Sequence, residues 1–380
     1  MPWRTVSSVL SPGRHYLSGA DAIAEGAIAA RCGYFAGYPI TPTTEVLERI
    51  AERFPQVGSS FAQMEDEIAS VCSCVGASWA GAKAMTVTSG PGFTLMQEGI
   101  GHAQMTEAPL VVVDGQRAGP STGQVVVGAG DVMQARWGMH GGIPTIALAP
   151  WSVQELYDGT ARAFNLAEKY RTPVFVMAEA ATMHLREIVQ VTPEIELYER
   201  DKKPGYPPFG CDTPDGVPPM PSFGEGEKLL VTASTHDERG FRRTEDPVAH
   251  RVLTSRLYHK IMDHVADLAE VEEHQLDDTE FAFVAYGFTA RSALAAVEEL
   301  RSDGLKVGLL RLKTLWPFPT NEVGRLGRRV TVIVVPEMNL GQMVHVVAAA
   351  AHCPVVPFNQ MDGTVIYPAL LVDAMRRAVA

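Results

Sequence analysis

The sequence has few cysteines, and their spacing matches no metal site. The five are Cys32, Cys72, Cys74, Cys211 and Cys353. None forms the Cys-x₂-Cys-x₂-Cys run of an iron–sulfur cluster or the paired Cys-x₂-Cys of a zinc site. Cys72 and Cys74 fall in a run of small residues, where buried thiols are expected. The pattern predicts a reduced, cytoplasmic chain with no metal or cluster of its own.

Long apolar runs and an excess of basic residues are also absent. No stretch approaches the roughly 20 apolar residues that cross a bilayer, and the start of the chain lacks the pattern of an export signal. The 32 basic residues stand against 44 acidic ones, a net charge of −12, and they form no dense cluster. These absences argue against membrane insertion and against nucleic acid as the main partner.

What the sequence has is a regular alternation of helix-like and strand-like runs from about residue 15 to 190. Several of the strand-like runs are continuously apolar, as in a sheet that is covered on both faces. The pattern predicts an α/β fold with a doubly wound parallel sheet. The expected strands are 33–37, 84–88, 109–114, 144–149 and 172–177, and the expected helices are 20–32, 44–54, 65–79, 92–104 and 151–170.

The second half of the chain reads differently. Seven prolines mark an irregular connection, and a helical pattern at about 246–275 places five apolar side chains on one stripe. Strand–helix alternation resumes at Phe281. We therefore expect a first domain at 1–190, a connection with a long helix at 191–276 and a smaller α/β domain at 277–380. The prolines are Pro204, Pro207, Pro208, Pro214, Pro218, Pro219 and Pro221, and the stripe is Leu253, Leu257, Ile261, Val265 and Leu268.

A rigid turn is expected at Tyr38-Pro39-Ile40-Thr41-Pro42, between the strand at 33–37 and the helix at 44–54. Two prolines fix φ on both sides of Thr41 and hold the residue before each extended. The hydroxyl of Thr41 thus stands at the carboxyl end of a parallel strand, where open α/β sheets bind ligands.

Three acidic residues, Glu65-Asp66-Glu67, open the expected helix at 65–79. Compensation of the helix dipole explains Glu65 and Asp66. Glu67 is followed by small residues that suit a helix pressed against other backbone. A carboxyl group there would be partly desolvated and could share a proton with a ring nitrogen.

The loop Ser89-Gly90-Pro91-Gly92 follows the strand at 84–88. Its glycines allow a flat ligand or a partner subunit to approach the backbone. It lacks the spacing of a phosphate-binding P-loop. The chain also lacks a Gly-Asp-Gly followed by Asn that would bind a diphosphate through a metal, since Gly130-Asp131-Val132 breaks at the third position.

Arg117 stands just past the expected end of the strand at 109–114, where a guanidinium can hold a carboxylate through two hydrogen bonds. The segment Gly119-Pro120-Ser121-Thr122-Gly123 also matches the Gly-x-Ser-x-Gly pattern of serine hydrolases. That alternative requires the serine between a strand and a helix, and the residues after Gly123 make a poor helix start.

Together these segments resemble the α subunit of the 2-oxoacid:ferredoxin oxidoreductases, enzymes that use thiamine diphosphate to oxidise 2-oxoacids to acyl-CoA. The turn at Thr41, the helix start at Glu67, the loop at Gly90 and the segment from Arg117 to Gly123 carry the resemblance. Further matches are Tyr170-Arg171-Thr172-Pro173-Val174, Leu315-Trp316-Pro317-Phe318-Pro319 and Pro336-Glu337-Met338-Asn339-Leu340-Gly341-Gln342.

The resemblance assigns roles to residues of this sequence. It makes 1–190 a pyrimidine-binding domain and 277–380 a transketolase-C-like domain. Glu67 matches the catalytic glutamate at N1′ of the aminopyrimidine, and Thr41 and Arg117 match residues that bind the substrate. The remaining cofactor contacts are expected from Tyr38, Pro39, Ile40, Ser89 and Gly90.

The resemblance also supplies partners. A β subunit is expected to hold the diphosphate, Mg²⁺ and a [4Fe–4S] cluster, and a separate γ subunit, CoA and a ferredoxin-like acceptor complete the system. The substrate remains open: 2-oxoglutarate is the first choice, with branched-chain and arylglyoxylate 2-oxoacids close behind. Lys83, Arg136 and His140 are candidate cations for a second carboxylate. A non-catalytic scaffold subunit is a further alternative, and intact Thr41, Glu67 and Arg117 argue against it.

Overall fold

The computed structural model describes residues 2–210 and 215–380, so Cys211 and Pro214 lie outside it. Its larger sheet has the strand order β15-β8-β9-β6-β5-β3-β4. Strand β15 (Thr314–Trp316) is antiparallel to β8, and the other six strands are parallel to one another. The doubly wound parallel sheet is thereby confirmed. The parallel strands are β3 (Tyr34–Gly37), β4 (Ser60–Gln63), β5 (Ala84–Thr88), β6 (Leu110–Ala118), β8 (Ile146–Leu148) and β9 (Pro173–Glu179).

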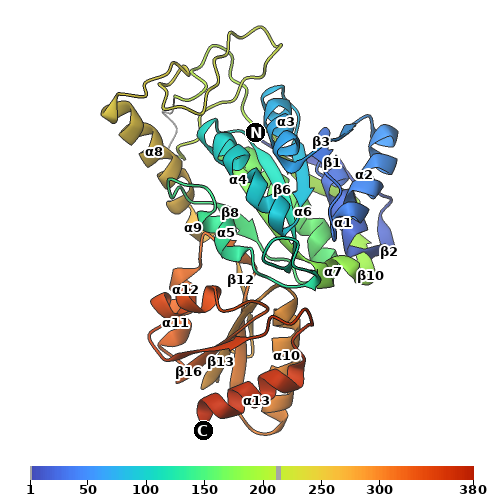
Figure 1. Ribbon diagram of the computed structural model, residues 1–380, viewed down its shortest axis with the longest axis vertical. Helices are drawn as coiled ribbons and strands as arrows, with labels where there is room; N and C mark the ends of the chain where they lie inside the picture. Colours follow the sequence, from blue (N-terminus) through green and yellow to red (C-terminus); the bar gives the residue numbers. More distant parts are fainter. Residues whose placement is uncertain (1, 211–214) are drawn as a thin grey trace.

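The helices cover both faces of this sheet (Figure 1). On one face, α1 (Gly19–Ala29), α2 (Thr44–Val57) and α6 (Val153–Tyr170) pack together; on the other, α3 (Glu67–Trp79) packs against α4 (Gly90–Met105). Alternate residues of β6 enter the two cores: Val111 and Val113 face the first group, and Leu110 and Val112 face the second. The continuous apolar run is therefore explained by burial on both sides.

Short elements that the sequence did not predict flank this sheet. At the start of the chain, two strands pair antiparallel with two strands that follow β9. A hairpin strand folds back on the end of β6. These elements are β1 (Trp3–Ser7), β2 (Gly13–Ser18), β7 (Gln124–Val127), β10 (Arg186–Val191) and β11 (Glu194–Tyr198), with the short helices α5 (Val132–Trp137) and α7 (Ala180–His184).

The long helix predicted at about 246–275 is wrong in its second half. Helix α8 (Pro247–Met262) is capped by Asp246, and a single turn, α9 (Val265–Leu268), follows it. The chain then becomes β12 (Val271–His274), which pairs antiparallel with a strand of the second sheet. Four residues of the predicted stripe are buried, and Val265 is half-buried. The helical spacing of the apolar residues holds through Leu268. Beyond it, pairing of Val271–His274 with a strand far along the chain replaces the helix.

The smaller sheet has the order β12-β14-β13-β16-β17. Helices α10 (Gly287–Ser302) and α13 (Pro368–Val379) pack as one pair, and α11 (Thr320–Gly327) and α12 (Met343–Ala350) as another. Its parallel strands are β13 (Phe281–Tyr286), β14 (Val307–Leu312), β16 (Val332–Glu337) and β17 (Val355–Asn359). This sheet and its helices form the lower part of the molecule in Figure 1.

The smaller sheet and its helices contact the larger sheet along its outer strand β8 and at the segment around Ala129 and Val132. Strand β15 (Thr314–Trp316) leaves the smaller unit and pairs with β8. The indole of Trp316 donates a 2.8 Å hydrogen bond to the Val132 oxygen, and Asn339 donates one of 2.7 Å to the Ala129 oxygen. These contacts place the segment after β16 over the strand ends. None of the helices in the described residues is both long and apolar enough to cross a bilayer.

Candidate active site

The turn after β3 places Thr41 at the carboxyl edge of the larger sheet. The peptide between Thr41 and Pro42 is cis, and Thr43 closes the turn with 2.8 Å hydrogen bonds from its amide and its hydroxyl to the Ile40 oxygen. Pro42 is buried, whereas Thr41 and Tyr38 are exposed. The predicted rigid turn is present, and it presents the Thr41 side chain outward.

Arg117 lies inside β6, not past its end as predicted. The strand continues to Ala118 because Gln116 pairs with Glu179 of β9 and Arg117 pairs with Val127 of β7. The Arg117 side chain is 5% exposed, and its Nη1 donates a 2.7 Å hydrogen bond to the Thr41 oxygen. The structure thus brings together two residues that are 76 positions apart in the chain.

Glu67 occupies the first turn of α3. Asp66 is the N-cap, and its carboxylate accepts a 2.7 Å hydrogen bond from the Ala69 amide, which is the ordinary helix-start role. Glu67 is 5% exposed, and no described residue donates a hydrogen bond to its carboxylate. A buried carboxylate without a protein partner fits a ligand that supplies one.

Close backbone packing surrounds this carboxylate. A Cβ atom added to Gly92 would lie 2.3 Å from Glu67 Oε1 and 2.2 Å from Thr88 Oγ1, so only glycine fits at this position. The hydroxyls of Thr88 and Ser89 are buried without partners. Gly90 has φ +35°, which turns the chain from β5 into α4. The expected cofactor residues Ser89 and Gly90 therefore lie next to Glu67.

A cavity of about 660 Å³ opens between this edge and the smaller unit. The larger sheet contributes Gly90, Arg117 and Asp131 to its wall, and the segment after β16 contributes Asn339 and Leu340. Leu340 is 77% exposed. The cavity combines one guanidinium with polar amides and an apolar edge, which suits a small anionic ligand.

Two carboxyl groups next to Arg117 were missed as site residues by the sequence reasoning. Asp114 in β6 is fully buried and neither of its oxygens has a hydrogen-bond donor, and Asp131 has one such buried oxygen. Burial, followed by the charge of Asp131, raises the pKa of Asp114 well above its usual range. Burial also raises the pKa of Asp131 to about 6, opposed by a hydrogen bond from Asp114 and by the charge of Arg117. The sequence did contain one signal for Asp114, because this aspartate directly follows the apolar run Leu110–Val113.

The three candidate cations for a second carboxylate are placed differently. Lys83 lies at the start of β5, away from the carboxyl edge, and donates a 3.0 Å hydrogen bond to the Tyr198 oxygen. The Cζ atom of Arg136 lies 3.9 Å from the centroid of the Trp137 ring, and its guanidinium donates hydrogen bonds to the oxygens of Gly142 and Ile143. His140 is exposed. Lys83 is therefore no candidate for a cation at this site.

Ser121 does not form a nucleophile elbow. It is exposed, has φ +55° and is followed by strand β7, so the segment from Gly119 to Gly123 is a hairpin turn. A hydrolase would need the serine between a strand and a helix. The geometry removes the basis of that alternative.

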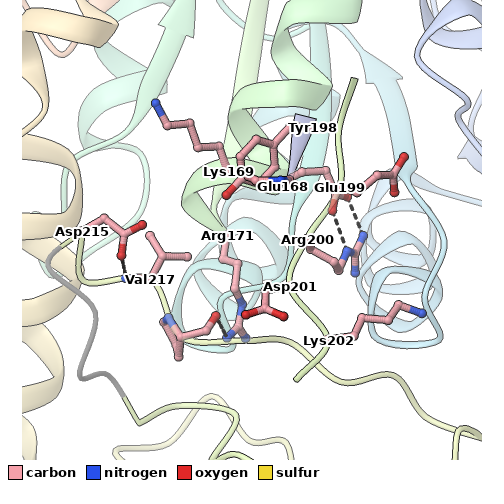
Figure 2. A pocket seen from close by; sticks show the side chains of 12 residues that line it. Glu168, Lys169, Arg171, Tyr198, Glu199, Arg200, Asp201, Lys202, Asp215 and Val217 are labelled. Carbon is pink, nitrogen blue, oxygen red and sulfur yellow. Dashed lines mark hydrogen bonds and ion pairs between the residues drawn. The ribbon is translucent and has the colours of Figure 1, made fainter. Parts of the chain in front are cut away.

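A second cavity, of about 490 Å³, lies beside the irregular connection (Figure 2). Its charged side chains already serve the fold: Arg200 forms hydrogen bonds of 2.5 and 2.6 Å with Glu168, and Arg171 donates to the oxygens of Pro208, Pro218 and Pro219. Figure 2 shows Lys169 and Lys202 pointing in different directions, not converging on one ligand. We assign this cavity to the anchoring of the connection.

No group of His, Cys, Asp and Glu side chains within the described residues is arranged to hold a metal ion. Among the cysteines, Cys32 and Cys74 are buried, Cys353 is half-buried and Cys72 is exposed. Burial raises the pKa of the Cys74 thiol to about 12, so it stays protonated at neutral pH. The buried thiol expected at Cys74 is confirmed, whereas the one expected at Cys72 is wrong because that side chain is exposed.

Comparison with known families gives two matches that together span most of the chain. Residues 25–254 match a family described as "Pyruvate flavodoxin/ferredoxin oxidoreductase, thiamine diP-bdg". Residues 279–371 match "Pyruvate:ferredoxin oxidoreductase core domain II". The first match includes Thr41, Glu67 and Arg117.

Individual relatives are similar along nearly their whole length. The chain is 51% identical over 332 residues to "2-oxoglutarate synthase subunit KorA" of Methanocaldococcus jannaschii, covering 86% of this chain and 89% of the relative. It is 46% identical over 343 residues to the subunit of the same name from Methanothermobacter thermautotrophicus, covering 89% and 91%.

A solved structure shares the fold. It is described as 2-oxoglutarate:ferredoxin oxidoreductase from Magnetococcus marinus with 2-oxoglutarate, coenzyme A and succinyl-CoA bound. The TM-score is 0.90 at 32% sequence identity, over 97% of this chain and 66% of the solved chain. This chain thus spans slightly less than two thirds of that relative.

Proposed function

Because this chain belongs to the α subunits of the 2-oxoacid:ferredoxin oxidoreductase family, we propose that it forms half of an active site that oxidises 2-oxoglutarate to succinyl-CoA and CO₂. The observation that carries this proposal is the carboxyl edge of the larger sheet, where Arg117 donates a hydrogen bond to the Thr41 oxygen and where Gly92, just after the Ser89-Gly90 loop, packs against Glu67. Similarity to subunits named for 2-oxoglutarate supports the substrate.

Thiamine diphosphate, when bound, supplies the electron sink for the electron pair released as a 2-oxoacid loses CO₂. Glu67 fits its aminopyrimidine because the carboxylate is buried and lacks a protein donor. Its role is to hold a proton against a ring nitrogen and so keep that ring in the required protonation state. Ser89, Gly90 and the turn Tyr38-Pro39-Ile40 form the surrounding wall.

Arg117 and Thr41 act on the substrate. The guanidinium of Arg117 compensates the charge of the 2-oxoacid carboxylate and orients it until it leaves as CO₂. Thr41, whose backbone oxygen accepts the hydrogen bond from Arg117, offers its exposed hydroxyl as a second contact for the substrate.

The remaining parts are proposed to come from partners. The described residues hold no metal-ligand group and the sequence has no diphosphate motif, which supports a β subunit that binds the diphosphate, Mg²⁺ and an iron–sulfur cluster. A separate γ subunit, CoA and a ferredoxin-like acceptor complete the proposed system. The domain limits 1–190, 191–276 and 277–380 remain proposals.

Turnover of the purified complex tests the function. CoA-dependent acceptor reduction is measured with 2-oxoglutarate, 2-oxoisovalerate, phenylglyoxylate and pyruvate, with the isolated chain as control. We expect the highest kcat/KM with 2-oxoglutarate and no turnover by the chain alone. Preference for a branched-chain or aromatic 2-oxoacid would reassign the substrate. Full activity of a complex that carries Glu67→Gln would instead favour the scaffold alternative.

A further inference from the structure

Asp114 and Asp131, called the aspartate pair below, are two neighbouring carboxyl groups close to Arg117. Asp114 ends the apolar run of β6 and is fully buried among the residues that face α3 and α4. Asp131 follows Ala129 and Gly130, whose backbone oxygens accept hydrogen bonds from Asn339 and Gln342 of the smaller unit. Thus one aspartate is fixed by the sheet and the other by the contact between the two units.

The Asp131 amide donates a 3.4 Å hydrogen bond to the side chain of Gln116, which lies two residues after Asp114 and on the same face of β6, so the two carboxyl groups are neighbours that interact directly. Neither oxygen of Asp114 has a hydrogen-bond donor if both groups are ionised, and the same holds for one oxygen of Asp131. Two ionised carboxylates at this site would repel each other strongly, even with the Gly90 amide facing both. One shared proton removes the repulsion and creates a hydrogen bond. Asp114 is the more buried of the two, so it is the better place for that proton.

Arg117 is the charged neighbour of this pair. It and Asp131 line the same cavity, and the charge of Arg117 lowers the pKa of Asp131. The Nε atom of Arg117 is buried without an acceptor, whereas Nη1 is held by the Thr41 oxygen. The turn at Thr41 therefore fixes the direction of the guanidinium. The charge of Asp131 reduces the electrostatic attraction between Arg117 and an anion.

We propose that protonated Asp114 donates a hydrogen bond to Asp131, and that the charge of Asp131 sets how strongly Arg117 attracts the carboxylate of a 2-oxoacid. The proposal rests on the role assigned to Arg117 above and adds a tuning residue to it. The Gly90 amide of α4 also faces both carboxyl groups. Arg117 is the charged side chain that acts on Asp131 from the surrounding elements.

The sign of the pH effect follows from these charges. Below about pH 6 both aspartates are neutral and Arg117 acts on the substrate with its full charge. As the pH rises through about 6, Asp131 ionises and partly cancels that charge, so the KM for the 2-oxoacid rises. We expect a rise of about three- to tenfold, the effect of an interaction worth up to one pKa unit.

Steady-state kinetics of the assembled complex from pH 5 to 8 tests this inference. Asp131→Asn should remove the rise in KM, so that the KM at pH 8 exceeds the KM at pH 5 by less than about twofold instead of about three- to tenfold. Asp114→Asn should retain the rise, because the amide still donates to Asp131. Asp114→Ala should move the midpoint above about pH 6, since the hydrogen bond that stabilises the ionised form is lost.

A double-mutant cycle links the effect to Arg117. In an Arg117→Ala background, Asp131→Asn should leave the pH dependence of KM unchanged. Infrared spectroscopy gives a readout besides activity. In a Glu179→Gln background, which removes the other buried carboxyl group with a pKa above 7, the C=O band of a protonated carboxyl group should be present at pH 7 and absent when Asp114→Asn is added. Thermal melting of each complex establishes that the variants fold.

Each result decides between two outcomes. A KM for Asp131→Asn that still rises through pH 6 overturns the inference, as does identical behaviour of Asp114→Asn and Asp131→Asn. If the wild-type complex turns over no 2-oxoacid, the proposed function fails instead. The infrared band then still reports whether Asp114 carries the proton.

Discussion

The guanidinium of Arg117 donates a 2.7 Å hydrogen bond to the main-chain oxygen of Thr41. Arg117 is fixed by β6, and Thr41 by the turn after β3, so the hydrogen bond locks two separate segments into one surface. A ligand carboxylate that meets Arg117 is therefore held at a set position relative to the Thr41 hydroxyl. This relationship makes the contributions of the two residues testable.

Replacement of Arg117 should weaken substrate use without disturbing the cofactor pocket. Loss of a hydrogen bond to a charged partner costs on the order of 1.5–3 kcal/mol, or roughly ten- to a hundredfold in kcat/KM. Arg117→Lys keeps the charge but loses the planar fork, so it should be less impaired than Arg117→Ala. Proton exchange at C2 of bound thiamine diphosphate, followed by NMR, serves as control. A collapse of exchange in Arg117→Ala would show that Arg117 organises the cofactor pocket.

Glu67→Gln should reduce turnover of the complex by about 10²–10⁴-fold, the range typical of general acid–base groups. The side chain keeps its size, so assembly with the partner should survive. C2-proton exchange should fall in parallel, because it depends on Glu67 and needs no substrate. Glu65→Gln is the matched control, since Glu65 is exposed and lies two residues earlier, before the N-cap of the helix. Near-normal exchange in Glu67→Gln would remove Glu67 from catalysis.

Glu179 should make the stability of the fold fall as the pH rises. It is buried at the end of β9, where its carboxyl accepts a 3.2 Å hydrogen bond from the Phe288 amide of α10. Burial raises its pKa to about 8, opposed by that hydrogen bond. Between an unfolded pKa near 4.5 and about 8, the folded state binds more protons than the unfolded state, so stability declines across this window.

Glu179→Gln should flatten this pH dependence and make the variant more stable than the wild type above about pH 8. The gain has an upper bound on the order of 5 kcal/mol, since one pKa unit is worth about 1.4 kcal/mol. Denaturant unfolding from pH 4 to 9 measures it, with the exposed Glu65→Gln as control. An unchanged slope in Glu179→Gln would show that Glu179 ionises freely in the fold.

Removal of the Glu107 charge should lower the free energy of unfolding, because Glu107 holds α8 to the first domain through Arg256 and Lys260. Glu107 accepts hydrogen bonds of 2.7 Å from Arg256 and 2.8 Å from Lys260, and all three groups are largely buried. Burial alone would raise its pKa, but Arg256 and Lys260 lower it far below the usual range. Its stabilisation is therefore present at neutral pH and is lost as the pH falls through that low value.

Glu107→Gln removes the carboxylate that forms ion pairs with Arg256 and Lys260 in a largely buried site, and it should cost about 3–5 kcal/mol of stability. The exposed pair of His259 and Asp263 on the same helix is the matched control, and Asp263→Asn should cost at most about 1 kcal/mol. Chemical denaturation at pH 7 compares the two. Equal losses would mean that α8 is held by its apolar stripe rather than by Glu107.

Local patterns in the sequence determined the layered fold and the central candidates. The apolar run Leu110–Val113 predicts a doubly covered strand because it must bury side chains on both faces. The prolines around Thr41 restrict φ by themselves, so the turn needs no tertiary information. The position of Glu67 in a helix start followed by small residues likewise follows from neighbouring residues alone.

Only the tertiary structure decided how these parts meet. Strand β6 reaches Arg117 because β9 and β7 pair with its end, and the predicted helix stops before Val271 because that residue pairs with Leu312. Asp131 is held near Asp114 because Asn339 of the smaller unit donates a hydrogen bond to the Ala129 oxygen, two residues before Asp131. These contacts join residues far apart in sequence, and their energies exceed the local preferences that spacing and propensity record.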